Sequence, residues 1–296
     1  MSCPQILKEA IEGLYSAFSG YALPEDTMPC SCCHDSSAND LLHAAPLREL
    51  QWEHVAEYST EALTVWGDLD CYKHFLPRIF ELVLTAGNWP KTPTPELVFG
   101  VLRYGQWRSW PQEEQDAITR MLQAAWETVR SNPPTASGYI DVDQWLCCIS
   151  QCEEDLIPYL DQWMRDERLS SAWALSCLVL GSTIAYTDAD TNHEWPAWSG
   201  EESLAKFEEW SRLPHRGPFW KKCDAQYAQL QQWVKYPAVL EKLERAAASC
   251  GDRDLERELR TARQCILEAP LSKFEVVYRE RRFQSAYWDS SNYRLY

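Results

Sequence analysis

The sequence predicts an all-α protein, because three features of the chain agree. Apolar residues recur every three or four positions along most segments, as they do on one face of an amphipathic helix. Strand-like alternation of apolar and polar residues is almost absent before the C-terminal tail, and Pro, Gly and Asp residues separate the segments at short intervals. We therefore predict an irregular antiparallel helical bundle or a HEAT-like α-solenoid, although the lack of a clean internal repeat weakens the solenoid interpretation.

In the first half of the chain, the spacing predicts helices over residues 6–18, 49–66, 71–86, 96–104 and 113–131. Gly67 suits the C-terminal cap of the second of these helices. Pro77 suggests that the third begins only just before it, since proline is best tolerated in a first helical turn. Ser109 and Gln112 have the spacing of a capping box that would open the last one.

In the second half, helices are expected over residues 143–151, 156–168, 170–184, 200–211, 220–234, 239–249 and 253–267. The Pro-rich break at 132–138 is the best candidate for a boundary, which would divide the chain into an N-terminal helical subdomain (1–132) with a Cys-rich loop and a C-terminal one (139–296). The aromatic, alternating tail at 273–296 predicts a short terminal strand or a packed extension.

The charge of the chain disfavours nucleic acid as a partner. The sequence has 44 acidic and 28 basic side chains, which gives a formal net charge of −16. A protein that binds DNA or RNA directly would normally present a basic face to the phosphates. An acidic protein instead favours a basic protein partner, although solubility alone also explains the charge.

Location in the cell is predicted from what the sequence lacks. No stretch reaches the roughly 18 uninterrupted apolar residues of a membrane helix, and the N-terminal segment does not have the pattern of a signal peptide. We therefore expect a soluble, cytoplasmic protein without a membrane partner, in which the 12 cysteines are reduced.

A cysteine cluster in the first loop suggests a metal site. Cys30 and Cys33 have the C-x-x-C spacing that brings two thiolates to one metal ion, and Cys71 and His74 have the same spacing at the start of the next apolar segment. Together these four residues would form a closed, structural zinc site. The alternatives are a loop of reduced cysteines packed on the core and, with less support from context, a redox pair.

The same region resembles a known group of proteins. The C-S-C-C sequence at 30–33 and the K-H-F-L-P-R-I-F-E-L segment at 73–82 are similar to motifs of a group of uncharacterised bacterial proteins, most clearly over residues 14–110. The resemblance implies a bacterial origin and brings no catalytic residue. Lys73 and Arg78 lie in this segment, either as cations that bind a ligand or as a basic helix face paired with internal carboxylates.

The sequence contains no established catalytic motif, so the function is predicted from charge and composition. A non-enzymatic binding protein that engages a basic toxin or effector domain, such as an immunity protein or an effector chaperone, is the leading hypothesis. Trp195 and Trp198 interrupt a polar loop and are its predicted anchors, unless they fold inward to close that loop. The alternatives are a metal-assisted enzyme with a site at loop 30–33 and segment 71–78, and a nucleic-acid mimic.

Overall fold

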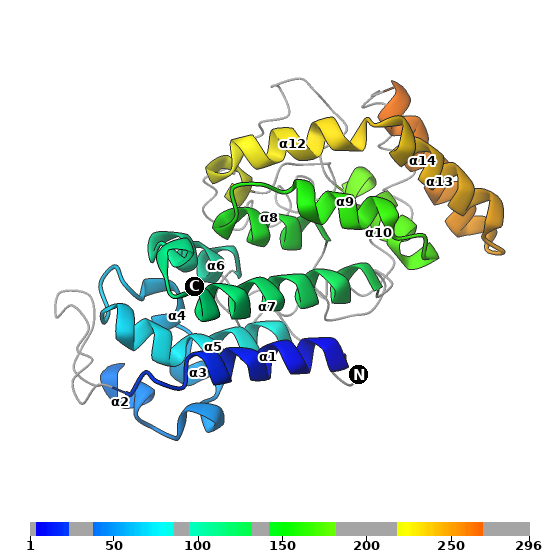
Figure 1. The fold of residues 1–296 in the computed structure, drawn as a ribbon. Coiled ribbons are helices and arrows are strands. Elements are labelled where there is room, and N and C mark those ends of the chain that lie inside the picture. The colour runs from blue at the N-terminus through cyan, green and yellow to red at the C-terminus, as the bar shows by residue number, and fades with distance from the viewer. Residues whose placement is uncertain (1–3, 24–37, 86–94, 132–141, 182–217, 269–296) are drawn as a thin grey trace, which may run out of the picture. The chain divides into compact units, whose positions relative to one another are not determined.

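The all-α prediction is confirmed by a computed structural model of the chain, which describes residues 4–23, 38–85, 95–131, 142–181 and 218–268 (Figure 1). Within these residues every regular element is helical, and the sole β-type pairing is an isolated bridge between Ala62 and Trp66. No helix in the described part of the chain is long and apolar enough to cross a membrane. The predicted helix at 200–211, the boundary at 132–138 and the tail at 273–296 lie outside the described residues.

The backbone contacts divide the chain into two units. Unit 1 comprises Met1–Thr128 with Gln151–Glu153, and unit 2 comprises Val129–Ser150 with Glu154–Tyr296. The division falls inside two helices, α7 (Gln112–Ser131) and α8 (Val142–Cys152), whose ends belong to different units.

Unit 1 is built on the packing of α1 (Gln5–Ala17) against α5 (Leu69–Thr85). The inward face of α1 repeats at helical spacing through Leu7, Ile11 and Leu14. The helix α5 is more deeply buried, because apolar residues occupy several of its faces. Unit 1 also contains α2 (Ala38–Leu42), α6 (Pro95–Tyr104) and η3 (Trp107–Ser109).

The long helix predicted over residues 49–66 is wrong. The structure has three short pieces there: η1 (Leu47–Glu49), α3 (Trp52–Val55) and α4 (Tyr58–Glu61). The hydroxyls of Ser59 and Thr64 donate to the carbonyl oxygens of Ala56 and Glu61. Such local bonds compete with helix bonding, and the positive φ of Leu63 (68°) takes the chain out of the helix.

Two other expectations for unit 1 are also wrong. The helix α5 begins at Leu69, so Pro77 lies in its interior. Asp68 supplies the start signal instead, since its carboxylate accepts a 2.9 Å hydrogen bond from the backbone amide of Cys71. The hydroxyl of Ser109 donates to the carbonyl oxygen of Gln106 and does not cap α7.

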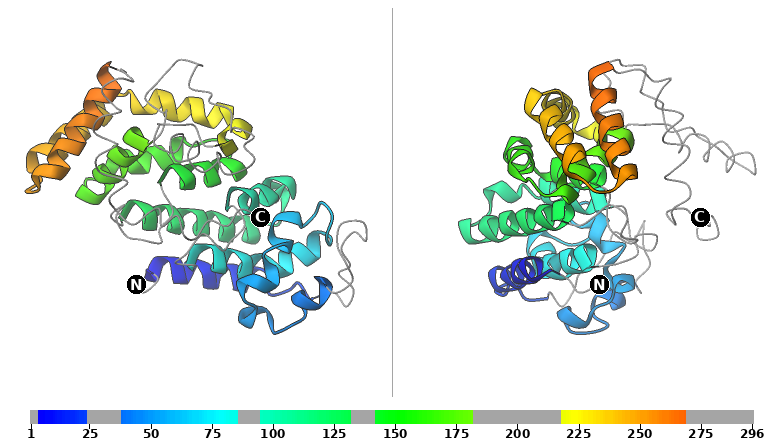
Figure 2. Two further views of the ribbon diagram at one scale, coloured as in Figure 1. Left: turned by 180° about the vertical axis from the view of Figure 1, so that it is seen from behind. Right: turned by 90° about the vertical axis from the view of Figure 1, so that its right-hand side faces the viewer.

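Unit 2 contains the helical elements α9 (Ile157–Arg165), α10 (Leu169–Gly181), η5 (Pro218–Lys222), α12 (Asp224–Val234), α13 (Pro237–Ser249) and α14 (Arg253–Glu268). The helices α13 and α14 lie side by side as an antiparallel hairpin, which also contacts α10 (Figure 2).

The helix predicted over residues 156–168 ends early, at Arg165. It ends there because Asp166 takes an extended conformation and its carboxylate accepts a bond from the backbone amide of Arg168.

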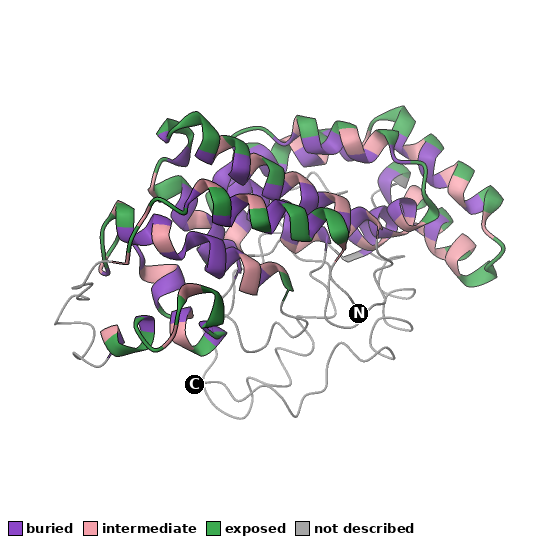
Figure 3. Cartoon of the chain, turned by 60° about the horizontal axis from the view of Figure 1, so that its bottom comes forward, coloured by how far each residue is buried: buried purple, intermediate pink, exposed green. Residues whose placement is uncertain are grey.

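The cores of the two units are rich in aromatic side chains. Every tryptophan in the described residues except Trp173 is buried, and Trp163 stacks on Trp233 in unit 2 with ring centroids 5.4 Å apart. The helices show the purple buried face and green exposed face expected of amphipathic segments (Figure 3). The interpretation of most tryptophans as core residues therefore holds for the described part of the chain.

Candidate functional site

Lys73, one of the two predicted ligand-binding cations, is paired inside unit 1. Its ammonium lies 2.7 Å from a carboxylate oxygen of Glu114 on α7 and donates a 3.0 Å hydrogen bond to the hydroxyl of Tyr21. The same hydroxyl donates to Glu114, and the ring of Trp110 lies 4.5 Å from the ammonium. Burial alone would lower the pKa of Lys73, but the bonds to Glu114 and Tyr21 outweigh it and raise the pKa.

Arg78, the second predicted cation, is also bound to internal acceptors. Its Nε donates to the carbonyl oxygen of Leu50 at 2.7 Å, and a terminal nitrogen donates to the carboxylate of Glu81 at 2.6 Å. Glu81 also accepts a bond from the hydroxyl of Tyr15 on α1, so Arg78 and Glu81 connect three segments of unit 1. Both cations are therefore bonded to acceptors within unit 1, as expected of a basic helix face that is paired with internal carboxylates.

Two of the predicted zinc ligands lie on α5, where each has a partner. Cys71 is buried, and its sulfur accepts a hydrogen bond from the hydroxyl of Tyr58 at 3.2 Å. The ring of His74 has Nδ1 2.8 Å from the carbonyl oxygen of Tyr21. Cys30 and Cys33 lie outside the described residues, so the four ligands are not seen together. Within the ranges that are described, no group of three or more His, Cys, Asp or Glu side chains could hold a metal ion.

The predicted aromatic anchors, Trp195 and Trp198, also lie outside the described residues.

Unit 1 has a segment in which exposed acidic side chains greatly outnumber basic ones. Between residues 40 and 70 the sequence has one lysine or arginine, Arg48, and its guanidinium makes two 2.8 Å bonds to the carboxylate of Glu12. The exposed carboxylates of this segment are those of Asp40, Glu49, Glu53, Glu57, Asp68 and Asp70. We call residues 40–70 the acidic segment.

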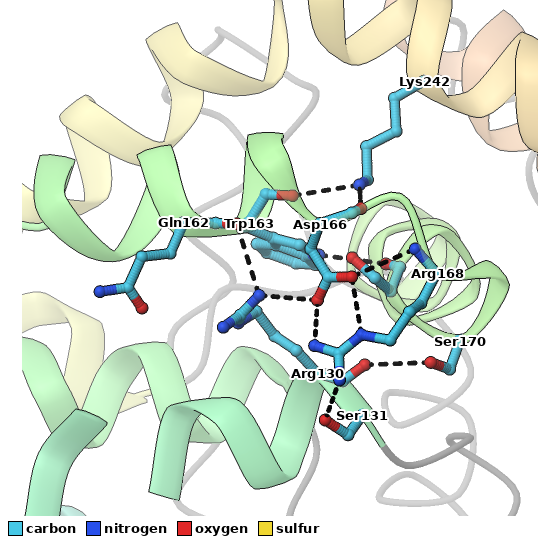
Figure 4. Close-up of polar contacts among 9 residues, drawn as sticks. Arg130, Ser131, Gln162, Trp163, Asp166, Arg168, Ser170 and Lys242 are labelled. Atoms are coloured by element: carbon cyan, nitrogen blue, oxygen red, sulfur yellow. Dashed lines mark hydrogen bonds and ion pairs between the residues drawn. The ribbon is translucent and has the colours of Figure 1, made fainter. Parts of the chain in front are cut away.

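The sequence did not predict a cluster of charges that lies in unit 2 around the buried carboxylate of Asp166 (Figure 4). This carboxylate follows the last turn of α9 and accepts bonds from two guanidinium groups. Arg130 of α7 donates to it at 2.7 Å, and Arg168 donates both through its backbone amide and through its side chain. Arg168 also bonds to the hydroxyl of Ser131, so the cluster ties the end of α7 to the turn between α9 and α10.

Asp166 is ionised in this setting. Burial raises the pKa of its carboxyl, but the hydrogen bonds from Arg168 and the charges of Arg168 and Arg130 outweigh that effect and hold the pKa below its ordinary value. The carboxylate is therefore the anionic centre on which the two arginines converge (Figure 4).

Lys242 of α13 is the third cation of the cluster, and its surroundings differ from those of the two arginines. Its ammonium donates to the backbone carbonyl oxygens of Trp163, at 3.1 Å, and of Asp166. Both carbonyls lie at the C-terminal end of α9, where a positive charge is favourable to the helix dipole. Burial nevertheless dominates, so the pKa of Lys242 is lowered to about 8.

A sequence signal for this cluster exists, but it is weak. The buried face of α13 runs through Val239, Lys242, Leu243 and Ala247, so a lysine stands at an otherwise apolar position. A lysine at such a position can also extend its stem along the surface and keep its charge in water. Only the fold shows that the ammonium of Lys242 instead donates to the carbonyl oxygens at the end of α9.

Comparison of the chain with protein-family models, with curated proteins and with solved structures gives no match.

Proposed function

We propose that this protein is a non-enzymatic binding protein of the bacterial cytoplasm that engages a basic protein partner. A toxin or effector domain is the kind of partner that suits it, and an immunity protein or an effector chaperone is the concrete form of the function. The observation that carries the proposal is the acidic segment, which exposes carboxylates while its single arginine is already bonded to Glu12.

The physical basis is electrostatic steering followed by desolvated contact. A net charge of −16 with a concentrated acidic segment attracts a basic surface and accelerates the encounter at low ionic strength. Aromatic anchors would then set the lifetime of the complex, and Trp195 and Trp198 remain the proposed anchors.

The internal pairing of Lys73 and Arg78 supports the same proposal. Because these cations are bound to Glu114, Glu81 and a backbone carbonyl, they contribute little positive charge to the surface of unit 1. The exposed carboxylates of the acidic segment therefore dominate the local field, which favours a cationic partner.

The first experiment is capture of partners from native cell extract on the immobilised full chain, followed by association kinetics with the protein recovered. The double variant Glu49→Gln, Glu53→Gln should slow association about tenfold at low salt and leave dissociation nearly unchanged, because exposed charges act on the encounter rate. The matched control is Glu241→Gln, Asp254→Asn, which removes the same charge from the α13–α14 hairpin. Trp195→Ala and Trp198→Ala should instead speed dissociation.

Two results would contradict the proposal. The first is that the acidic-segment variant and the hairpin control slow association equally, so that net charge alone acts. The second is that no basic protein is recovered while the pure chain turns over a small molecule, which would favour the metal-assisted enzyme.

We also propose that Cys30, Cys33, Cys71 and His74 bind a structural zinc ion. Two contacts on α5 support this. A histidine that donates one ring nitrogen to a backbone carbonyl, as His74 does to Tyr21, has its other ring nitrogen oriented for a metal, and the Tyr58 hydroxyl can donate to Cys71 as a thiolate.

Metal analysis of the purified chain should then find about one equivalent of zinc, since four such ligands hold one tetrahedral ion. Cys30→Ser should lower the melting temperature, because the binding energy of a structural metal is folding energy. Cys250→Ser, at the end of α13, is the control and should leave both the zinc content and the melting temperature nearly unchanged. Metal-free protein with unchanged melting after Cys30→Ser would end the zinc proposal.

A further inference from the structure

The α13–α14 hairpin packs on α10, and a buried lysine links it to the end of α9. Lys242 is 4% exposed and lies on the face of α13 that carries Val239 and Leu243. Its hydrogen bonds are to the carbonyl oxygens of Trp163 and Asp166 (Figure 4). These two neutral carbonyls accept from two of the three N–H groups of the ammonium but do not neutralise its charge.

The charged groups around Lys242 do not offset the lowering of its pKa by burial. Asp166 and Glu167, in the turn after α9, favour the charged form, while Arg130 of α7 and Arg245 of α13 itself oppose it. The carboxylate of Asp166 is already bonded to Arg130 and Arg168, so its charge is shared with two guanidinium groups. A charged ammonium in this position therefore destabilises the docked hairpin.

The other helices packed on α13 do not change this balance. The helix α14 faces it with Arg260 and Arg263, both of which pair with Glu244. The helix α10 has no charged residue, and the one charged residue of α12, Asp224, is exposed.

We propose that the docking of the α13–α14 hairpin onto α9 is coupled to the protonation of Lys242, so that the docked state is weaker at neutral pH and becomes stronger as the pH rises. In a detached hairpin the ammonium is in water and holds its proton up to its ordinary pKa. In the docked hairpin it loses the proton earlier. Detachment therefore takes up a proton, and the docked population grows as protons become scarce.

The sign of the coupling follows from the direction of the shift. The pKa in the docked state, about 8, lies below the ordinary value of 10.5. Between these two values the detached or unfolded chain binds more protons than the docked chain, so the docked state gains stability with increasing pH across that window.

The test is hydrogen–deuterium exchange of the full chain at pH 7 and pH 9.5, read as protection factors that are corrected for intrinsic exchange. In the wild type, the protection of amides in α13 should rise on the order of tenfold relative to amides in α8. In Lys242→Met the same ratio should stay constant with pH. The variant should also melt at or above the wild-type temperature at pH 7, since an apolar side chain of similar length removes the unfavourable burial of a positive charge.

Three outcomes would overturn the proposal. The wild-type ratio of α13 to α8 protection could stay flat or fall between the two pH values. Lys242→Met could keep the wild-type pH dependence. The variant could also fail to fold or melt well below the wild type at pH 7, which would show that the bonds to the α9 carbonyls outweigh the burden of the charge.

Discussion

Two lysines, one in each unit, are buried to the same extent, and yet their pKa values are shifted in opposite directions. Lys73 and Lys242 are each 4% exposed. The pKa of Lys73 is raised, while that of Lys242 is lowered to about 8. Burial disfavours the ammonium at both places, so the difference comes from the acceptors, which are the carboxylate of Glu114 for one and two backbone carbonyls for the other.

The comparison separates two roles of a hydrogen bond to a buried charge. Carbonyl oxygens satisfy the geometry of an ammonium, but a nearby carboxylate also removes its uncompensated charge. Lys73 therefore stabilises unit 1 at neutral pH, and this contribution is lost as the pH rises through its raised pKa in the folded state. The buried charge of Lys242 lowers the stability of unit 2 at neutral pH, and this loss becomes smaller as the pH increases and the ammonium loses its proton.

The largest expected effect comes from removing the paired lysine. Lys73→Met should lower the free energy of unfolding by about 3–5 kcal/mol, because it leaves the carboxylate of Glu114 buried without its cation. Denaturant unfolding at pH 7 measures this. Lys8→Met, at an exposed position of α1, is the control and should change the free energy by less than about 0.5 kcal/mol. If Lys73→Met were as stable as Lys242→Met, the distinction between the two lysines would fail.

The sequence predicts the helices of this protein better than it predicts their interruptions. The predictions for residues 96–104, 113–131 and 253–267 agree with α6, α7 and α14 to within one residue at each end, because the helical spacing of apolar residues runs through each segment. The prediction over residues 49–66 fails because hydroxyl-to-carbonyl bonds and the left-handed Leu63 stop a segment whose apolar spacing would continue.

The candidate sites are less predictable, since partners far apart in the chain decide what a charged residue does. The motif around Lys73 is visible in the sequence, but Glu114 lies on another helix and cannot be assigned to it from spacing. Lys242 shows the same limit, because its acceptors belong to α9. Whether a basic residue on an apolar helix face is buried, and in which direction its pKa shifts, therefore depends on the fold.

The smallest expected effect tests the electrostatic account of Lys242 through two exposed neighbours of opposite sign. Arg245 lowers and Glu167 raises the pKa of Lys242. Arg245→Gln should therefore move the pH-dependent gain in stability to a higher pH, and Glu167→Gln should move it to a lower pH. Each shift should be a fraction of about one pKa unit, because solvent screens exposed charges.

The measurement is the free energy of unfolding between pH 7 and pH 10, compared between each variant and the wild type. Arg257→Gln on α14 makes the same charge change as Arg245→Gln away from Lys242, and it should leave the midpoint of the gain in place. Both shifts should shrink in 1 M salt, where the Debye length is about 3 Å, and vanish in a Lys242→Met background. Shifts of the same sign in the two variants would mean that something other than the charge on Lys242 sets the pH dependence of unit 2.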